Sequence, residues 1–225
     1  ILYREKDFYD KYKVNLILGE RVREIDVSRK MVILEKGSSL PYDKLLIATG
    51  ASPKSLGIKG EDKYGVFGFR TLTDADEIIK LADKAGEAVI FGGGLIGLKA
   101  AYGLKKRGIN VKVMVKSPRV LSQVVDSEAA QIIGGWLQEN GIIIRTGIAP
   151  EEILGDGEVQ EVKLDNGEKI SAKLVIVGKG VSCNTSLVEN SPVKVHWGII
   201  TDDFLQTSVE DIFAAGDVAE TKDLV

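Results

Sequence analysis

Cysteine and histidine are scarce in this sequence. The 225 residues contain one cysteine, Cys183, and one histidine, His196. A single cysteine excludes an internal disulfide and any cysteine-pair redox centre within these residues, and it is typical of a protein from the reducing cytoplasm. The histidine has no cluster of Cys, Asp or Glu beside it in the sequence, so we expect no metal site.

An excess of one charge and long apolar runs are missing as well. Lys plus Arg number 30 and Asp plus Glu number 33, which gives a formal net charge of −3. A nucleic-acid surface needs a basic excess to neutralise phosphates, so we expect no nucleic-acid partner. Apolar runs such as Leu45–Ala48 and Ala88–Phe91 are far shorter than the ~20 residues that cross a bilayer. We therefore expect a cytoplasmic protein without a membrane span.

Glycine, by contrast, is abundant, and it separates short stretches of regular patterning. The 25 glycines among 225 residues exceed the usual share of about 7%. Breaker residues between Gly50 and Gly68 indicate a connection between domains. Before Gly50 the pattern predicts only strands, over residues 15–18, 21–27, 30–35 and 45–48.

From residue 73 onward the pattern predicts alternating helices and strands. Thr73 and Asp76 have capping-box spacing, which predicts the start of a helix that ends at Gly86. A strand, a helix and a second strand follow, which together make a β-α-β unit. The elements expected here are a strand over 88–91, a helix over 98–107, a strand over 111–115, a helix over 127–140, a strand over 142–145 and a hairpin of 158–164 with 169–177.

One glycine motif carries chemistry. Residues 92–97 read Gly-Gly-Gly-Leu-Ile-Gly, which is G-x-G-x-x-G between a predicted strand and a predicted helix. In that context Gly92 makes the tight turn, Gly94 lets the backbone approach a pyrophosphate, and Gly97 lets helix and strand pack closely. The diphosphate would lie on the helix N-terminus, beside Leu95 and Ile96. We expect a dinucleotide site; the alternative is a glycine-rich turn that binds no ligand.

The end of the next strand bears on the choice of cofactor. An NAD site usually has Asp or Glu there, which accepts hydrogen bonds from the ribose 2′-OH. This chain has Lys116 instead, and Arg119 follows shortly after. Both cations could pair with a 2′-phosphate, so the sequence favours NADPH over NADH. The alternative is a solvated basic turn.

Four blocks of the sequence follow one another in an order that known proteins share. They are Leu45–Pro53, Phe69–Ala75, the glycine motif and Asp211–Asp217. In this order they resemble the FAD-dependent pyridine nucleotide–disulphide oxidoreductase superfamily. They are similar to its branch of rubredoxin and ferredoxin reductases, NADH oxidases, coenzyme A disulfide reductases and the flavin module of nitrite reductase, and Gly94–Tyr102 is similar to the nitrite reductase module in particular.

The resemblance implies roles for further residues. Val22 would offer its backbone to the FAD adenine, and Thr49 and Gly50 would line the flavin domain. Gly216 and Asp217 match the second flavin motif, whose aspartate hydrogen-bonds the ribityl chain. Another position, Gly178, would lie near the nicotinamide. Two departures concern cofactor choice, because Lys99 stands where the family usually has Glu and Lys116 where it often has an acid.

The resemblance also implies a fold and an activity. We expect an α/β, three-layer Rossmann-like fold, in which an NAD(P)-binding domain over residues 70–180 is inserted in an incomplete FAD-binding domain made of residues 1–69 and 181–225. The activity would be hydride transfer from NAD(P)H to FAD, with no side chain here acting as acid or base. Electrons would pass on to rubredoxin, ferredoxin, oxygen, a disulfide or a nitrite reductase centre.

The same resemblance implies that the chain is the middle of a longer protein and that this protein is a homodimer. A second glycine fingerprint for the FAD diphosphate is absent from the sequence. Two alternatives therefore stay open, which are an isolated NAD(P)-binding module and a non-catalytic scaffold that lacks functional FAD.

Overall fold

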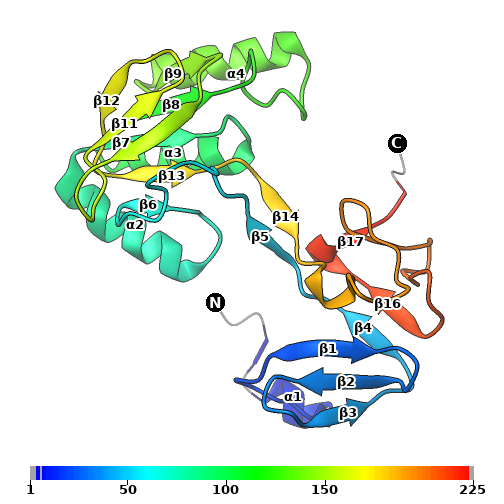
Figure 1. Cartoon of the computed structure of the whole chain (residues 1–225). Helices are drawn as coiled ribbons and strands as arrows, with labels where there is room; N and C mark the ends of the chain where they lie inside the picture. The colour runs from blue at the N-terminus through cyan, green and yellow to red at the C-terminus, as the bar shows by residue number, and fades with distance from the viewer. Residues whose placement is uncertain (1–3, 6, 223–225) are drawn as a thin grey trace. The chain divides into compact units, whose positions relative to one another are not determined.

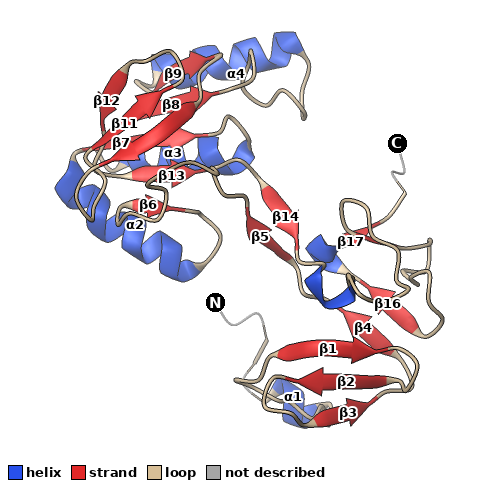
Figure 2. Ribbon diagram, in the orientation of Figure 1, coloured by secondary structure: helices blue, strands red, loops and turns tan. Residues whose placement is uncertain are grey.

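The computed structural model describes residues 4–5 and 7–222, and the chain forms two compact units. The flanking unit consists of residues 1–52 and 182–225, and the inserted unit consists of residues 53–181. Figure 2 shows that the long helices belong to the inserted unit and that strands and loops dominate the flanking unit. The first boundary lies earlier than the expected 69/70, because the segment after Pro53 contributes a strand to the inserted unit's sheet.

The inserted unit is built on a five-stranded parallel sheet (Figure 1). The strands are β6 (Val66–Phe67), β7 (Glu87–Phe91), β8 (Asn110–Val115), β9 (Ile143–Thr146) and β13 (Val175–Val177). The helices are α2 (Leu72–Ala85), α3 (Leu95–Lys106) and α4 (Ser127–Glu139). The strand order in the sheet is β6-β13-β7-β8-β9, so the β-α-β unit of β7, α3 and β8 lies at its centre.

A second, antiparallel sheet gives the inserted unit its third layer. It consists of β10 (Pro150–Leu154), β11 (Glu161–Leu164) and β12 (Lys169–Ser171). Side chains alternate along β7, since Ala88 and Ile90 pack with the helices whereas Val89 and Phe91 pack with residues of the antiparallel sheet. Both faces of β7 are therefore buried, as a central parallel strand requires. This arrangement confirms the predicted three-layer, Rossmann-like α/β class.

The flanking unit joins several short sheets around one core. An antiparallel sheet holds β1 (Val22–Asp26), β2 (Met31–Leu34) and β3 (Ser39–Pro41). Two parallel pairs are formed by β4 (Leu45–Ile47) with β16 (Ile212–Ala214), and by β15 (Ile199–Ile200) with β17 (Ala219–Glu220). The other elements of this unit are α1 (Phe8–Lys11), η1 (Ser186–Val188) and η2 (Gly216–Val218). The chain passes between the two units along β5 (Ala51–Pro53) and β14 (Val181–Cys183), which pair with each other.

Three expected elements differ from the structure. Residues 15–18 form no strand, because they pair with no other strand and their apolar side chains are exposed. The capping box of α2 uses Thr71 and Asp74, two residues before the expected pair. The predicted hairpin over 158–177 is also wrong in its second half, since β13 leaves the antiparallel sheet and joins the parallel one.

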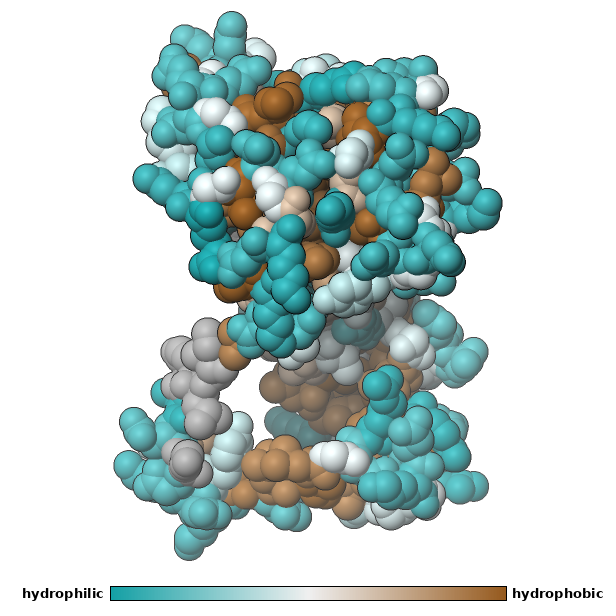
Figure 3. Space-filling view, turned by 90° about the vertical axis from the view of Figure 1, so that its left-hand side faces the viewer, coloured by the Kyte–Doolittle hydropathy of each residue, from teal (hydrophilic) through white to brown (hydrophobic). Residues whose placement is uncertain are grey.

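On the face of the inserted unit that Figure 3 shows, hydrophobic residues lie between polar and charged ones. Most of the residues on this face are hydrophilic. Among the described residues, no helix combines the length and the apolar character that a bilayer crossing needs.

Candidate functional site: a cavity at the turn between β7 and α3

Three glycines pack backbone against backbone where β7 leads into α3. Gly92 has φ +129°, and a Cβ there would overlap the carbonyl oxygen of Gly178. A Cβ on Gly97 would overlap the carbonyl oxygen of Gly92, and one on Gly178 would lie 3.0 Å from the Cα of Gly97. The Gly178 N–H also donates to the carbonyl of Phe91 at 2.8 Å. The turn therefore needs glycine at these positions on steric grounds.

Gly94 differs from these three because the space beside it is open. A Cβ built on Gly94 would meet no atom within 4 Å. The residue is the N-cap of α3, which has no side-chain capping hydrogen bond and no acidic residue in its first turn. The first N–H groups of a helix have no intrahelical partner. The turn thus presents N–H groups and the positive end of a helix dipole to an approaching anion.

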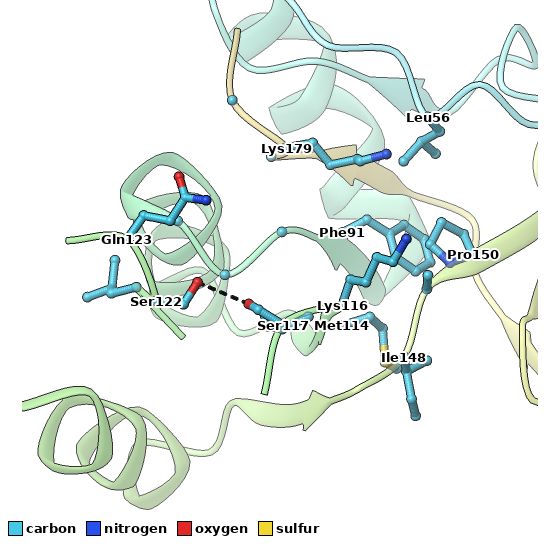
Figure 4. Close-up of a pocket in the computed structure, with 18 of the residues that line it drawn as sticks. Leu56, Phe91, Met114, Lys116, Ser117, Ser122, Gln123, Ile148, Pro150 and Lys179 are labelled. Carbon is cyan, nitrogen blue, oxygen red and sulfur yellow. Dashed lines mark hydrogen bonds between the residues drawn. The ribbon is translucent and has the colours of Figure 1, made fainter. Parts of the chain in front are cut away.

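The turn forms one wall of a cavity of about 650 Å³. Figure 4 shows the side chains of Lys116 and Lys179 extending into it, while Ser122 Oγ donates to Ser117 Oγ at 3.3 Å. The residues that line the cavity are Leu56, Phe91–Gly94, Met114–Ser117, Leu121–Val124, Ile148–Pro150 and Gly178–Gly180. No Asp or Glu is among these lining residues. A cavity with apolar walls and two ammonium groups suits an anionic ligand that has a planar apolar part.

The structure brings several of the predicted site residues together at this cavity. Gly92, Gly94, Lys116 and Gly178 line it. Gly97 is buried behind the turn and sets its packing. Two other predicted residues, Leu95 and Ile96, belong to the first turn of α3, where their side chains are exposed and outside the cavity lining. Their contribution to a ligand would come from the backbone.

Arg119 requires a correction. Its guanidinium is half-buried and donates to the carbonyl oxygens of Ser122 and Val125, at 3.3 Å each. It does not line the cavity. These two hydrogen bonds tie the guanidinium to the loop between β8 and α4. Of the two predicted cations, only Lys116 faces the candidate site.

Lys179 is a lining residue that the sequence analysis missed. It comes directly after Gly178, at the carboxyl end of β13. In open α/β sheets, ligands bind outside the carboxyl ends of the strands. The pairing of β13 with β7 is therefore the observation that would have identified Lys179 as a site residue. That neighbour relation is a long-range property, which the local pattern around residue 179 does not contain.

In the flanking unit, two predicted segments meet at one sheet edge. Thr49 and Gly50 follow β4, while Gly216 and Asp217 follow β16. The two strands are parallel, with Ile47 opposite Ala214, so both segments emerge at the same end. Gly216 has φ +76°, which is the left-handed conformation that glycine adopts freely. The structure thus places these four residues at the carboxyl ends of a strand pair.

Asn184 organises this edge and was also missed. Its side-chain amide donates to the carbonyl oxygen of Thr49 at 2.9 Å, and its side-chain oxygen accepts from Ser52 Oγ at 2.8 Å. Its backbone N–H donates to the Gly50 carbonyl at 2.9 Å.

The remaining predicted residue, Val22, begins β1 opposite Leu34 and is half-buried. Among the described residues there is no cluster of three or more metal-ligating side chains.

The sequence profile described as pyridine nucleotide-disulphide oxidoreductase matches residues 6–225. The chain belongs to this family. Within the pyridine nucleotide-disulphide oxidoreductases, it is 36% identical over 220 residues to the assimilatory nitrate reductase electron transfer subunit of Bacillus subtilis (strain 168), which covers 98% of this chain and 28% of that protein. It is 33% identical over 222 residues to the rubredoxin-NAD(+) reductase of Pseudomonas putida, covering 98% of this chain and 58% of that reductase.

A solved relative shares the fold over nearly the whole chain. The covalent putidaredoxin reductase–putidaredoxin complex matches with a TM-score of 0.93 and 30% identity, over 99% of this chain and 55% of the other. This chain therefore spans between about a quarter and three fifths of the relatives described here.

Proposed function

We propose that this chain is the nucleotide-binding part of an NAD(P)H-dependent flavoprotein oxidoreductase. The observation that carries the proposal is the glycine turn before α3, which opens at Gly94 into a cavity lined by two lysines and no carboxylate. That chemistry fits the diphosphate of a pyridine dinucleotide. The names of the relatives, which include rubredoxin-NAD(+) reductase, support the same activity.

Each residue's part in binding follows from its position. The backbone at Gly94, Leu95 and Ile96 would hold the diphosphate, and apolar side chains such as Phe91 and Met114 would exclude water from the cavity. In the flanking unit, Thr49, Gly50, Gly216 and Asp217 would hold FAD at the edge of β4 and β16, and Val22 would contact its adenine. When bound, the nicotinamide supplies a hydride that the flavin accepts, so no side chain of this chain has to move a proton in that step.

Lys116 supports a preference for NADPH over NADH. It directly follows β8, where an NAD-selective site has a carboxylate, and its side chain lines the cavity. Lys116→Glu should lower the affinity for NADPH relative to NADH by about tenfold or more, because a charged hydrogen bond to phosphate is lost and a repulsion is added. Lys173→Glu is the matched control, since Lys173 is exposed and outside the lining. An unchanged NADPH-to-NADH ratio in Lys116→Glu would contradict the preference.

The test of the whole proposal is the absorption spectrum of the purified protein. We expect a bound flavin whose absorption NADPH bleaches in the absence of oxygen. The reduced flavin should then pass its electrons on to a small electron-carrier protein. Sedimentation measures whether the protein is the expected homodimer. The putidaredoxin reductase–putidaredoxin complex supports this kind of partner. A protein that binds NADPH but holds no FAD would instead be an NAD(P)-binding module.

A further inference from the structure

The cavity contains a second cation that the expected cofactor site does not account for. The role proposed for Lys116 is to bind the 2′-phosphate on the ribose of NADPH. No role in binding has yet been assigned to Lys179. We propose that Lys179 binds the diphosphate bridge of the dinucleotide from its nicotinamide side, so that it anchors NADH and NADPH alike. This inference rests on the proposed function, because it takes the cavity to be the dinucleotide site.

The strand order places the two lysines on opposite flanks of the glycine turn. In the order β6-β13-β7-β8-β9, β7 leads into the turn, β8 lies on one side of it and β13 on the other. Lys116 is the residue after β8 and Lys179 lies two residues after the end of β13. A dinucleotide bound across the end of β7 has its adenosine ribose at the end of the next strand, β8. Its other half then extends toward β13 and Lys179.

The backbone around Lys179 is fixed to the phosphate-binding turn. On one side, the Gly178 N–H donates to the Phe91 carbonyl at 2.8 Å, and the Gly178 Cα packs against Gly92 and Gly97. On the other side, the Gly180 carbonyl accepts from the Lys54 N–H at 3.0 Å. The residue between these two anchors is held at the edge of the turn, and Figure 4 shows its side chain reaching across the cavity.

The charge around Lys179 also points to an anionic ligand. Within the part of the chain that the structure describes, neither Lys179 nor Lys116 forms an ion pair, and the cavity lining has no carboxylate. Many exposed lysines elsewhere do have a carboxylate partner, for example Lys59 with Glu152 at 2.7 Å. A lysine ammonium attracts a phosphate as a point charge, so the interaction does not need the planar pair of donors that an arginine presents.

The experiment compares Lys179→Gln with Lys116→Gln in the full chain by titration calorimetry. The four ligands are NADPH, NADH, ADP-ribose and adenosine 2′,5′-bisphosphate, which lacks the nicotinamide-side phosphate. Lys179→Gln should weaken NADPH, NADH and ADP-ribose by a similar factor of about ten and leave the bisphosphate unchanged. Lys116→Gln should weaken only NADPH and the bisphosphate. Lys173→Gln, an exposed lysine before β13, is the control and should change none of them.

The outcomes separate this inference from the function on which it rests. If the unsubstituted chain binds none of the four ligands, the proposed function fails and Lys179 has no ligand. If the chain binds them and Lys179→Gln leaves ADP-ribose unchanged, only the assignment of Lys179 fails. A loss confined to NADPH would place Lys179 on the 2′-phosphate and overturn the inference in that way. Melting curves of all variants should coincide, because these side chains are exposed.

Discussion

At the scale of single residues, both the packing of the turn and the expected ligand binding require that Gly97 has no side chain. Gly97→Ala places a Cβ into the Gly92 carbonyl, so the turn must shift. We expect a loss of about 1–3 kcal/mol in unfolding free energy together with weaker NADPH binding. Gly103→Ala is the control in the same helix, because a Cβ at exposed Gly103 meets no atom within 4 Å. It should stabilise the protein by about 0.5–1 kcal/mol and leave NADPH binding unchanged, in chemical denaturation and titration.

Glu220 is the residue for which we expect a pH-dependent stability. Its carboxylate accepts from the Gly198 N–H at 2.9 Å, from His196 Nδ1 at 2.8 Å and from the Trp197 N–H at 2.6 Å. The hydrogen bond from Gly198, followed by that from His196, lowers the pKa of Glu220 below the ordinary glutamate range. A carboxylate with a depressed pKa stabilises the fold above its unfolded pKa, and that stabilisation is lost as pH falls through the folded pKa.

The substitution that tests this is Glu220→Gln, which keeps the size of the side chain and removes its charge. The unsubstituted protein should melt at a higher temperature than Glu220→Gln at about pH 7, and the difference should shrink toward about pH 3. Thermal melting at several pH values measures it. A difference that stays the same over this range would show that the charge of Glu220 does not stabilise the fold.

At the scale of elements, the start of α2 depends on a reciprocal cap. Thr71 Oγ1 accepts from the Asp74 N–H at 3.1 Å, while the Asp74 carboxylate accepts from the N–H groups of Thr71 at 2.8 Å and Arg70 at 2.9 Å. Asp74→Ala should therefore destabilise the inserted unit by about 0.5–2 kcal/mol, measured by denaturation. Thr73→Ala, at the position that the sequence pattern favoured, should leave stability nearly unchanged. The reverse result would place the cap at Thr73.

Elements were predictable where the signal is local. The strand, glycine turn and helix around residues 88–107 carry their own turn chemistry and periodicity, so the β-α-β unit followed from the sequence. Gly92, Gly94 and Lys116, which the sequence singled out, lie together at the cavity, and their binding roles stay predictions. Residues 15–18 have the composition of a strand but no partner strand, and only the tertiary structure reveals that. Lys179 was missed because its place beside the glycine turn depends on the pairing of β13 with β7, which is a long-range property. Arg119 was assigned to the ligand from its charge and position alone, whereas its guanidinium binds the carbonyl oxygens of Ser122 and Val125.

At the scale of the whole molecule, the inserted unit supplies all the residues that line the cavity. Every residue that lines the cavity falls between Leu56 and Gly180, inside residues 53–181. Both core clusters of this unit also use only residues from that range, whereas the core around Ile47 and Ile212 uses only the flanking unit. No core cluster of the described residues draws on both units. A single continuous segment thus contains both of these core clusters and every residue that lines the cavity.

We therefore expect residues 53–181, expressed alone, to fold cooperatively and to bind NADPH within about threefold of the full chain's affinity. The flanking unit is made of two separate segments whose shared core closes only when both are present, so residues 1–52 alone should show no cooperative melting. Circular dichroism melting and NADPH titration of both segments measure this. If residues 53–181 fold but do not bind NADPH, groups outside the cavity lining are required, and the site described here is incomplete.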